Sequence, residues 1–306
     1  MNQDLITIGK RAQIAANKLA LMNTATKNKA LLQLADDLIK NKNQIIAANQ
    51  QDLAAATQMP TKFTDRLMVN SQRIADMANG LRTIADLNDP TSQIDKGWIT
   101  KDGLQILQRR VPLGVIGIIF EARPNVTVDA TGLTFKSGNA VILRGGKEAI
   151  QTNTALVKIL RESLKKQHLP VDAVQLITDT SHAIADEMMN LTDYIDVLIP
   201  RGGRALIQRV VTTATVPVIE TGAGNCHIYI DKDADLTMAT NITVNAKVQR
   251  PSVCNAAEKL LIHRDIAAEF LPVIAKALME HGVQLRGDET ACQLVSTIRP
   301  VTDEDW

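Results

Sequence analysis

The stretch Gly114-Val-Ile-Gly-Ile-Ile-Phe120 is apolar throughout and leads into the turn Glu121-Ala-Arg123-Pro-Asn125. A short continuous apolar run before a turn is typical of a strand that is covered on both faces of a sheet. Segments with helical spacing separate it from further apolar runs, which predict strands at residues 140–143, 174–177, 195–199 and 216–220. Strands that alternate with helices in this way predict an α/β fold built on a doubly wound parallel sheet.

The turns after these strands are expected at the carboxyl edge of the sheet, where folds of this class bind ligands. Two of them, Arg144-Gly145-Gly146-Lys147 and Arg201-Gly202-Gly203-Arg204, combine glycine, cations and a following helix. A phosphate group requires those features, so we predict that both turns bind a cofactor. The alternative is two solvated turns that use glycine for geometry. The fingerprint G-x-G-x-x-G is absent, since Gly222-Ala-Gly224 lacks the third glycine and leads into a strand.

Cys254 follows a long amphipathic segment that ends near Gln249, because Pro251 prevents the helix from continuing. Lys247 and Arg250 lie a few residues before it, and nearby cations lower the pKa of a thiol. This pattern favours a nucleophilic cysteine on a short loop. The alternative is a buried structural cysteine, since free cysteines are among the most buried residues.

The remaining segments complete the predicted organisation. Helical spacing over residues 4–57 and 64–87 predicts packing helices, and the pair Asp102-Gly103 predicts a β-hairpin arm with a type I′ turn at about residues 97–111. The edge of such an arm is free to pair with another chain. We place the N-terminal helices and the cofactor domain in residues 1–230 and a catalytic domain in residues 231–306.

Composition limits the function classes. A chain of 306 residues with 45% hydrophobic and 22% charged residues is typical of a soluble protein with two domains. A net charge of +1 and an aromatic content of 3% argue against nucleic acid or a membrane as a partner. Three cysteines far apart in sequence predict reduced thiols in the cytoplasm. The histidines show no metal-binding spacing, and the serine motif G-x-S-x-G is absent.

Four stretches, residues 113–125, 136–148, 218–227 and 248–256, resemble the gamma-glutamyl phosphate reductases, a family of the aldehyde dehydrogenase superfamily. The resemblance implies NADPH-dependent reduction of L-glutamate 5-phosphate to L-glutamate 5-semialdehyde and phosphate, the second step of proline biosynthesis. It also implies an aldehyde-dehydrogenase-like fold whose catalytic domain continues past residue 306. We expect a homo-oligomer and a contact with glutamate 5-kinase.

The resemblance assigns roles to individual residues. Cys254 falls at the nucleophile, Asn125 at the oxyanion-hole asparagine, and Glu220 at the general base of the hydrolytic members. A thioester formed on the cysteine would accept hydride from nicotinamide, with no attack by water, so the role of Glu220 stays open. Arg144 falls where the superfamily usually has a lysine that reaches the adenosine ribose.

Cations are needed where the phosphoryl group approaches a thiolate. The cations expected to bind the substrate are therefore Arg123, Arg250 and Lys247. Asn225 is a fourth expected substrate-binding residue, although it carries no charge. Arg144 and Lys147 favour NADPH over NADH, because an arginine can hold a 2′-phosphate. Three alternatives remain: an NAD-dependent aldehyde dehydrogenase that hydrolyses its thioester, a nucleotide-binding module without chemistry, and a cofactor-independent cysteine hydrolase.

Overall fold

The computed structural model describes residues 2–56, 61–220, 224–251 and 253–305. The chain forms two compact units, Met1–Thr221 and Gly222–Trp306. Most of the stretch Gly222-Ala-Gly224 lies outside the described residues, so only Gly224 of that stretch is discussed below.

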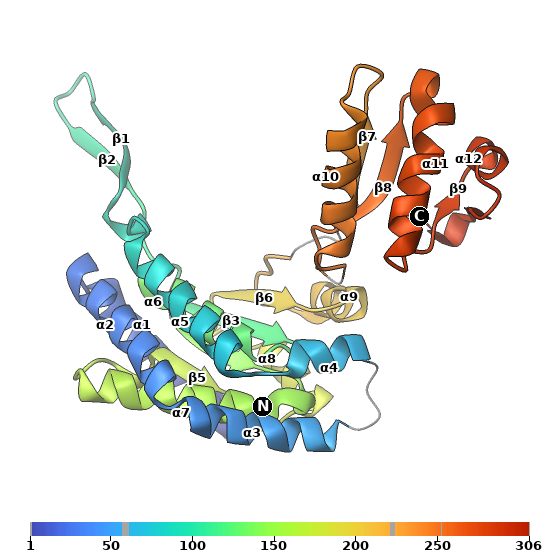
Figure 1. Ribbon diagram of the computed structural model, residues 1–306. Helices are drawn as coiled ribbons and strands as arrows, with labels where there is room; N and C mark the ends of the chain where they lie inside the picture. The colour runs from blue at the N-terminus through green and yellow to red at the C-terminus, as the bar shows by residue number, and fades with distance from the viewer. Residues whose placement is uncertain (1, 57–60, 221–223, 252, 306) are drawn as a thin grey trace. The chain divides into compact units, whose positions relative to one another are not determined.

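A four-stranded parallel sheet forms the centre of the first unit, in the order β5-β4-β3-β6 (Figure 1). Its strands are β3 (Val115–Phe120), β4 (Ala140–Arg144), β5 (Val174–Leu176) and β6 (Val197–Arg201). The expected α/β class is confirmed. The predicted fifth strand is not continuous, because residues 216–220 contribute only an isolated parallel bridge between Val218 and Leu198.

Helices cover the sheet because the connections run in two directions. The chain moves outward from β3 to β5 through α6 (Asn125–Lys136) and α7 (Ile150–Lys166), then returns to β6 through α8 (His182–Met189). Right-handed crossovers in opposite directions place these helices on opposite faces of the sheet. The apolar strands are buried on both faces for this reason, as the burial of every residue of β3 shows.

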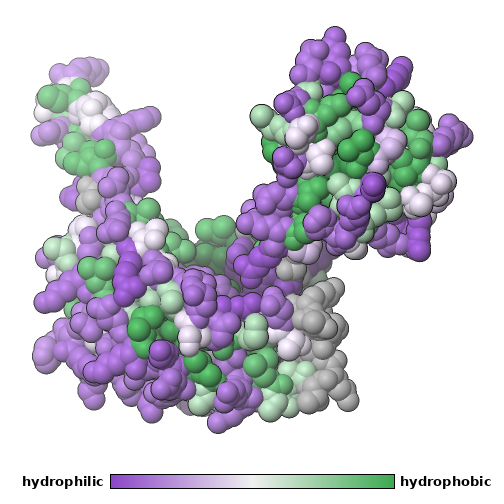
Figure 2. All heavy atoms as spheres, in the orientation of Figure 1, coloured by the Kyte–Doolittle hydropathy of each residue, from purple (hydrophilic) through white to green (hydrophobic). Residues whose placement is uncertain are grey.

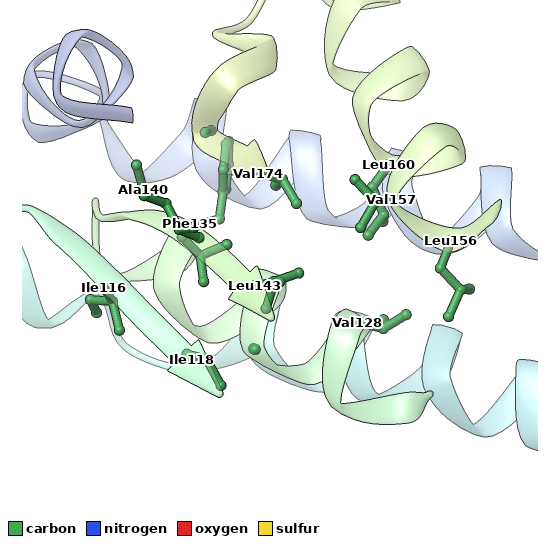
Figure 3. Close-up of a cluster of buried hydrophobic side chains, with 14 of the residues drawn as sticks. Ile116, Ile118, Val128, Phe135, Ala140, Leu143, Leu156, Val157, Leu160 and Val174 are labelled. Carbon is green, nitrogen blue, oxygen red and sulfur yellow. The ribbon is translucent and has the colours of Figure 1, made fainter. Parts of the chain in front are cut away.

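Further helices extend both layers. Helix α1 (Gln3–Ala20) packs against β4 and the short helix η3 (Val171–Ala173), and the amide of its cap, Asn2, donates a 2.5 Å hydrogen bond to Glu187 of α8. On the other side, α6 and α7 are covered by α2 (Thr24–Lys40), α3 (Lys42–Ala55) and α5 (Ser71–Asp86). Two shorter helices are α4 (Thr61–Leu67) and α9 (Arg204–Thr213). Figure 3 shows part of the resulting core, where side chains of β3 and β4 meet those of α6 and α7.

The predicted arm is an antiparallel hairpin of β1 (Ile94–Ile99) and β2 (Gln105–Arg109). Its turn differs from the predicted type I′ turn. Thr100 and Leu104 pair across a three-residue loop, and only Gly103 has a positive φ, of 83°. A three-residue loop needs a single left-handed residue, whereas a type I′ turn needs two. Asp102 does not have the positive φ that a type I′ turn would require, so the predicted turn type is wrong.

A buried ion pair lies just before this hairpin. The Lys27 ammonium is 2.5 Å from the Asp89 carboxylate, and these side chains are 1% and 2% exposed. Thr24 donates to the same carboxylate at 2.8 Å, and the Thr91 hydroxyl donates at 2.7 Å. The pair joins α2 to the short helix η1 (Pro90–Ser92), which immediately precedes β1. The pair therefore ties the start of the arm to the helical layer.

The second unit is built on two parallel strands, β7 (Cys226–Ile230) and β8 (Ala257–Ile262). Helices α10 (Leu236–Val248) and α11 (Arg264–Glu280) pack with these strands around a small core that includes Phe270. A second short parallel pair, β9 (Arg286–Gly287) with β10 (Arg299–Pro300), accompanies α12 (Glu289–Leu294). The domain boundary predicted from the sequence falls after residue 230. The pairing of β7 with β8 puts β7 in the second unit instead.

Candidate active site

The turns after β3 and β6 are held together by Glu121, which immediately follows β3. Its carboxylate accepts a 3.0 Å hydrogen bond from the Gly203 amide, and its own amide donates to the Arg201 carbonyl at 3.2 Å. A Cβ on Gly202 would lie 2.7 Å from the Glu121 carboxyl carbon, so a larger residue there would displace the Glu121 side chain. Sequence reasoning missed Glu121. The Gly203 amide hydrogen is bonded to the Glu121 carboxylate. The sequence instead predicts that this amide faces a cofactor phosphate.

Arg144 ends β4 and is buried, with an exposed fraction of 8%. Its Nη2 donates to the carbonyl oxygens of Thr180 at 2.5 Å and Ser181 at 3.0 Å. Burial lowers the pKa of Arg144, while the nearby carboxylates of Asp179 and Glu148 raise it. The guanidinium therefore supports the loop after β5, whereas the sequence predicts that it holds the 2′-phosphate directly.

Lys147, by contrast, is exposed at the start of the short helix η2 (Lys147–Ala149), which precedes α7. Of the two cations predicted in this turn, Lys147 is the one whose side chain is accessible to a ligand. Gly146 lies between them, and a Cβ there would approach the Glu148 carboxylate to 2.7 Å. The turn thus combines a buried cation that supports it with an exposed one.

Asn153 lies beneath the glycine turn and was not predicted. It is fully buried, and its Oδ1 accepts a 3.0 Å hydrogen bond from the Thr127 hydroxyl. Its Nδ2 has no hydrogen-bond partner among the described residues. A Cβ on Gly145 would overlap that nitrogen and lie 3.1 Å from the Phe120 ring. The turn therefore lies directly on a buried polar group with spare donor capacity, which fits a site for a polar cofactor.

Asn125 is exposed at the first position of α6, at the carboxyl end of the β3 turn. Its Nδ2 donates a 2.9 Å hydrogen bond to Oδ2 of Asp129. An amide nitrogen carries two hydrogens, so one remains for a ligand. Arg123, two residues earlier, is half-buried, and its amide donates to the Glu121 carbonyl at 2.6 Å.

Cys254 lies in the second unit, in the turn between α10 and β8, and its side chain is exposed. The flanking hydrogen bonds join the Val253 amide to the Arg250 carbonyl at 3.3 Å and the Ala256 amide to the Val253 carbonyl at 3.2 Å. This exposure does not fit a buried structural cysteine. Lys247 is in the last turn of α10, and Arg250 is exposed just beyond that helix.

The two other predicted residues are also exposed. Glu220 follows the isolated bridge at Val218, in the first unit. Asn225 immediately precedes β7, in the second unit, and its carbonyl oxygen lies 2.7 Å from Nδ1 of His227. Within the described parts of the chain, no group of three His, Cys, Asp or Glu side chains is arranged to hold a metal ion. None of the described helices is long and apolar enough to cross a membrane.

Comparisons with known proteins identify the family. The aldehyde dehydrogenase family model matches residues 2–299. A gamma-glutamyl phosphate reductase from Limosilactobacillus reuteri strain DSM 20016 is 98% identical over all 306 residues, which span 74% of that protein. The chain belongs to the gamma-glutamyl phosphate reductases. The family named from the four sequence stretches is confirmed.

More distant gamma-glutamyl phosphate reductases support the same assignment. The protein from Ligilactobacillus salivarius strain UCC118 is 57% identical and is matched over 74% of its length. The crystal structure of the Thermotoga maritima gamma-glutamyl phosphate reductase matches with a TM-score of 0.92 at 44% identity, over 99% of this chain and 74% of that one. The yeast structure matches with a TM-score of 0.66 at 31% identity, over 97% of this chain and 74% of that chain. The expected aldehyde-dehydrogenase-like fold is therefore confirmed.

Proposed function

We propose that this chain reduces L-glutamate 5-phosphate to L-glutamate 5-semialdehyde and phosphate with NADPH, as a step of proline biosynthesis. The observation that carries the proposal is an exposed Cys254 on a turn, in a member of a reductase family named for gamma-glutamyl phosphate. Of the three cysteines, Cys226 and Cys292 are half-buried. An accessible thiol is what nucleophilic attack on an acyl carbon requires.

The proposed chemistry has two stages. The Cys254 thiolate attacks the acyl carbon, and the bond from that carbon to the phosphate oxygen breaks, so that phosphate leaves with the electron pair. A nicotinamide cofactor held at the turn from Arg144 to Lys147 would supply the hydride that the thioester carbon accepts. The resulting oxyanion accepts a hydrogen bond from the Asn125 amide, a contact that strengthens as charge develops. Collapse of this adduct breaks the carbon–sulfur bond, releases the aldehyde and restores the thiolate.

The proposed cofactor site is the turn from Arg144 to Lys147 together with the turn from Arg201 to Gly203, where Arg201 is exposed and the Gly203 amide is bonded to Glu121. Gly145 and the spare Nδ2 hydrogens of Asn153 support a polar ligand at the first turn. We assign recognition of the 2′-phosphate to Lys147, because it is exposed while Arg144 is bound to Thr180 and Ser181. This assignment refines the prediction that both cations contact the cofactor.

The decisive variant is Cys254→Ser, made in this chain and in the 98% identical Limosilactobacillus relative. NADPH oxidation that depends on the acyl phosphate should be lost, while NADPH binding, measured by fluorescence titration, should be unchanged. The matched control is Cys292→Ser, which should retain turnover. Substantial turnover by Cys254→Ser would contradict the proposed mechanism.

The hydrolytic alternative is tested in the reverse direction. A reductase that forms an acyl phosphate needs inorganic phosphate to oxidise the aldehyde, whereas a hydrolytic aldehyde dehydrogenase uses water with a glutamate as general base. Oxidation should therefore depend on phosphate and persist in Glu220→Gln. Oxidation without phosphate that is lost in Glu220→Gln would establish the alternative.

We also propose a homo-oligomer that uses the hairpin arm. Figure 2 shows apolar side chains on the arm, and Ile99 and Leu104 are 72% and 63% exposed. Exposed apolar side chains beside free strand edges favour association with another chain. The contact with glutamate 5-kinase and the cytoplasmic location stay predictions, which co-purification and cell fractionation would test.

A further inference from the structure

Gly224, two residues before β7, lies directly against the backbone of Cys254. A Cβ on Gly224 would lie 3.1 Å from the Cys254 carbonyl carbon and would overlap the carbonyl oxygen. Both are backbone atoms, so no side-chain rotation would relieve the overlap. Gly224 is not among the glycines with positive φ. Glycine is therefore required here by the space that the Cys254 peptide occupies, and the local backbone conformation would accept other residues.

Cys226, two residues after Gly224, contacts the same carbonyl group of Cys254. Its Sγ lies 3.6 Å from the Cys254 carbonyl oxygen, as a thiol donor to that oxygen. Cys226 begins β7 and is paired with Ala257 of β8, with a shift of register between Cys226 and His227, so the pairing holds the backbone that carries the thiol. Gly224 thus limits the space around the Cys254 carbonyl, and Cys226 supplies it with a donor.

Fixing this carbonyl has a consequence for the thiol. The carbonyl direction sets ψ of Cys254, and the turn hydrogen bonds of Val253 and Ala256 hold the chain on either side. These constraints limit the motion of the peptide that carries the Cys254 side chain. Displacement of a reacting group by about 1 Å can lower a rate by about 100-fold, so a turn with a free carbonyl would position the nucleophile poorly.

We propose that Gly224 and Cys226 are positioning residues for Cys254, which hold its carbonyl so that the thiol and the amide point toward the reacting carbon. The proposal rests on the function proposed above, because it requires Cys254 to be the nucleophile. Neither residue takes part in bond making. Their effect is on the orientation of the peptide that carries the thiol.

The test uses Gly224→Ala, Cys226→Ala and Cys226→Ser in this chain and in the 98% identical relative. Gly224→Ala should lower kcat with the acyl phosphate by about 100-fold without changing the KM for NADPH. Cys226→Ala should lower kcat by about 3- to 10-fold, in keeping with one weak donor, and Cys226→Ser should recover part of the loss because a hydroxyl also donates. If the two residues had a purely structural role, their variants would lower the melting temperature. They would not lower kcat selectively while KM for NADPH stays unchanged, and serine at position 226 would not restore kcat.

One control is matched to the cysteine variants. Cys292 makes the same kind of contact, with its Sγ 3.6 Å from the Gly287 carbonyl oxygen, and Cys292→Ala should leave turnover unchanged. If Gly224→Ala does not fold, the two Cys226 variants decide the question.

Alkylation of Cys254 by iodoacetamide, followed by peptide mass spectrometry, separates this proposal from the function. The rate should differ from the wild-type rate by about threefold or more in the Gly224 and Cys226 variants. Kinetics and alkylation rates within twofold of wild type, roughly the scatter between neutral surface variants, would overturn the positioning role. An active Cys254→Ser would overturn the function instead, and alkylation would still report whether the turn is held.

Discussion

The Asn125 side-chain nitrogen lies 2.9 Å from the Asp129 carboxylate, one turn later in α6. Burial raises the pKa of Asp129, and the hydrogen bond from Asn125 and the charge of Arg201 oppose that effect. An ionised carboxylate is an acceptor only. The contact therefore fixes which end of the Asn125 amide faces Asp129, and leaves one N–H for a ligand.

Asn125→Ala should lower kcat by about 100- to 1000-fold, as expected for loss of one oxyanion donor. Asp129→Asn keeps an acceptor beside Asn125 and should lower kcat by less than Asp129→Ala does. Both Asp129 variants should leave the KM for NADPH unchanged. Steady-state kinetics with the acyl phosphate checks the order of the three variants. An Asn125→Ala enzyme with normal kcat would remove Asn125 from the oxyanion site.

The ion pair of Lys27 and Asp89 predicts a pH-dependent stability. Burial by itself would raise the pKa of Asp89, but Lys27 and the hydroxyls of Thr91 and Thr24 outweigh it and lower the pKa to about 2. A lowered carboxyl pKa stabilises the fold above the unfolded pKa, and that contribution is lost as the pH falls through the folded value. About 2 kcal/mol should therefore disappear between about pH 4 and pH 2.

Asp89→Asn should destabilise the protein by about 3 kcal/mol at pH 7, because it leaves the Lys27 ammonium buried without a counter-charge. The difference in the free energy of unfolding between Asp89→Asn and wild type should become smaller as the pH falls below about 4. Urea unfolding at several pH values measures both effects. Asp36→Asn removes an exposed partner of Arg82 instead and should cost less than about 1 kcal/mol. Equal effects of the two variants would contradict the role of burial.

The exposed cation of the β4 turn should decide cofactor preference. Lys147→Ala should lower the kcat/KM ratio of NADPH over NADH by about 10- to 100-fold, since one charge-assisted contact to the 2′-phosphate is lost. Arg144→Ala should act mainly on stability, because its guanidinium binds the carbonyl groups of Thr180 and Ser181. A preference that survives loss of both cations would place 2′-phosphate recognition elsewhere.

Binding of the substrate's phosphoryl group should depend on cations near the turn that carries Cys254. Arg250→Ala, and Lys247→Ala to a smaller extent, should raise the KM for the acyl phosphate and leave cofactor affinity unchanged. Arg123→Ala tests the candidate beside the β3 turn. Arg264→Ala, in the first turn of α11, is a charge-matched control. Unchanged kinetics for Arg123→Ala, Arg250→Ala and their double variant would exclude both arginines from substrate binding.

The hairpin arm should control the oligomeric state. Replacing Ile99 and Leu104 by glutamate puts charges on two of its exposed apolar positions, which disfavours association. The variant should sediment as a smaller species than wild type in analytical ultracentrifugation. A matched double change at Met238 and Ile242, which are exposed in α10, should leave sedimentation unchanged. The same sedimentation for arm variant and wild type would exclude the arm as the interface.

The sequence was sufficient where local pattern and tertiary context agree. The continuous apolar runs of β3 and β4 are buried strands, as their composition predicts. The run at residues 216–220 has a similar composition but forms only one bridge, at Val218. Whether an apolar run joins a sheet depends on the space at the sheet edge, which the run itself does not encode.

For the candidate site, residue types were predictable but their partners were not. Arg144 was correctly placed at a strand end, yet its contacts with Thr180 and Ser181 depend on how the loop after β5 packs. Asn153 gave no signal, because a polar residue in the first turn of a helix is ordinarily solvated. Glu121 did carry one, since a carboxylate directly after a buried strand must find a donor at the sheet edge.

Gly117 and Gly224 are both glycines because a Cβ would not fit, but they are open to very different evolutionary histories. A Cβ on Gly117 would press on the ends of the Leu198 and Met188 side chains, at 2.5 Å and 2.9 Å. A lineage can replace Gly117 once a smaller side chain has arisen at either neighbour. At Gly224 the obstacle is the peptide of Cys254, which every amino acid shares. No substitution at a neighbouring residue makes room for a Cβ at position 224. A replacement of Gly224 therefore cannot be compensated by a change of another side chain.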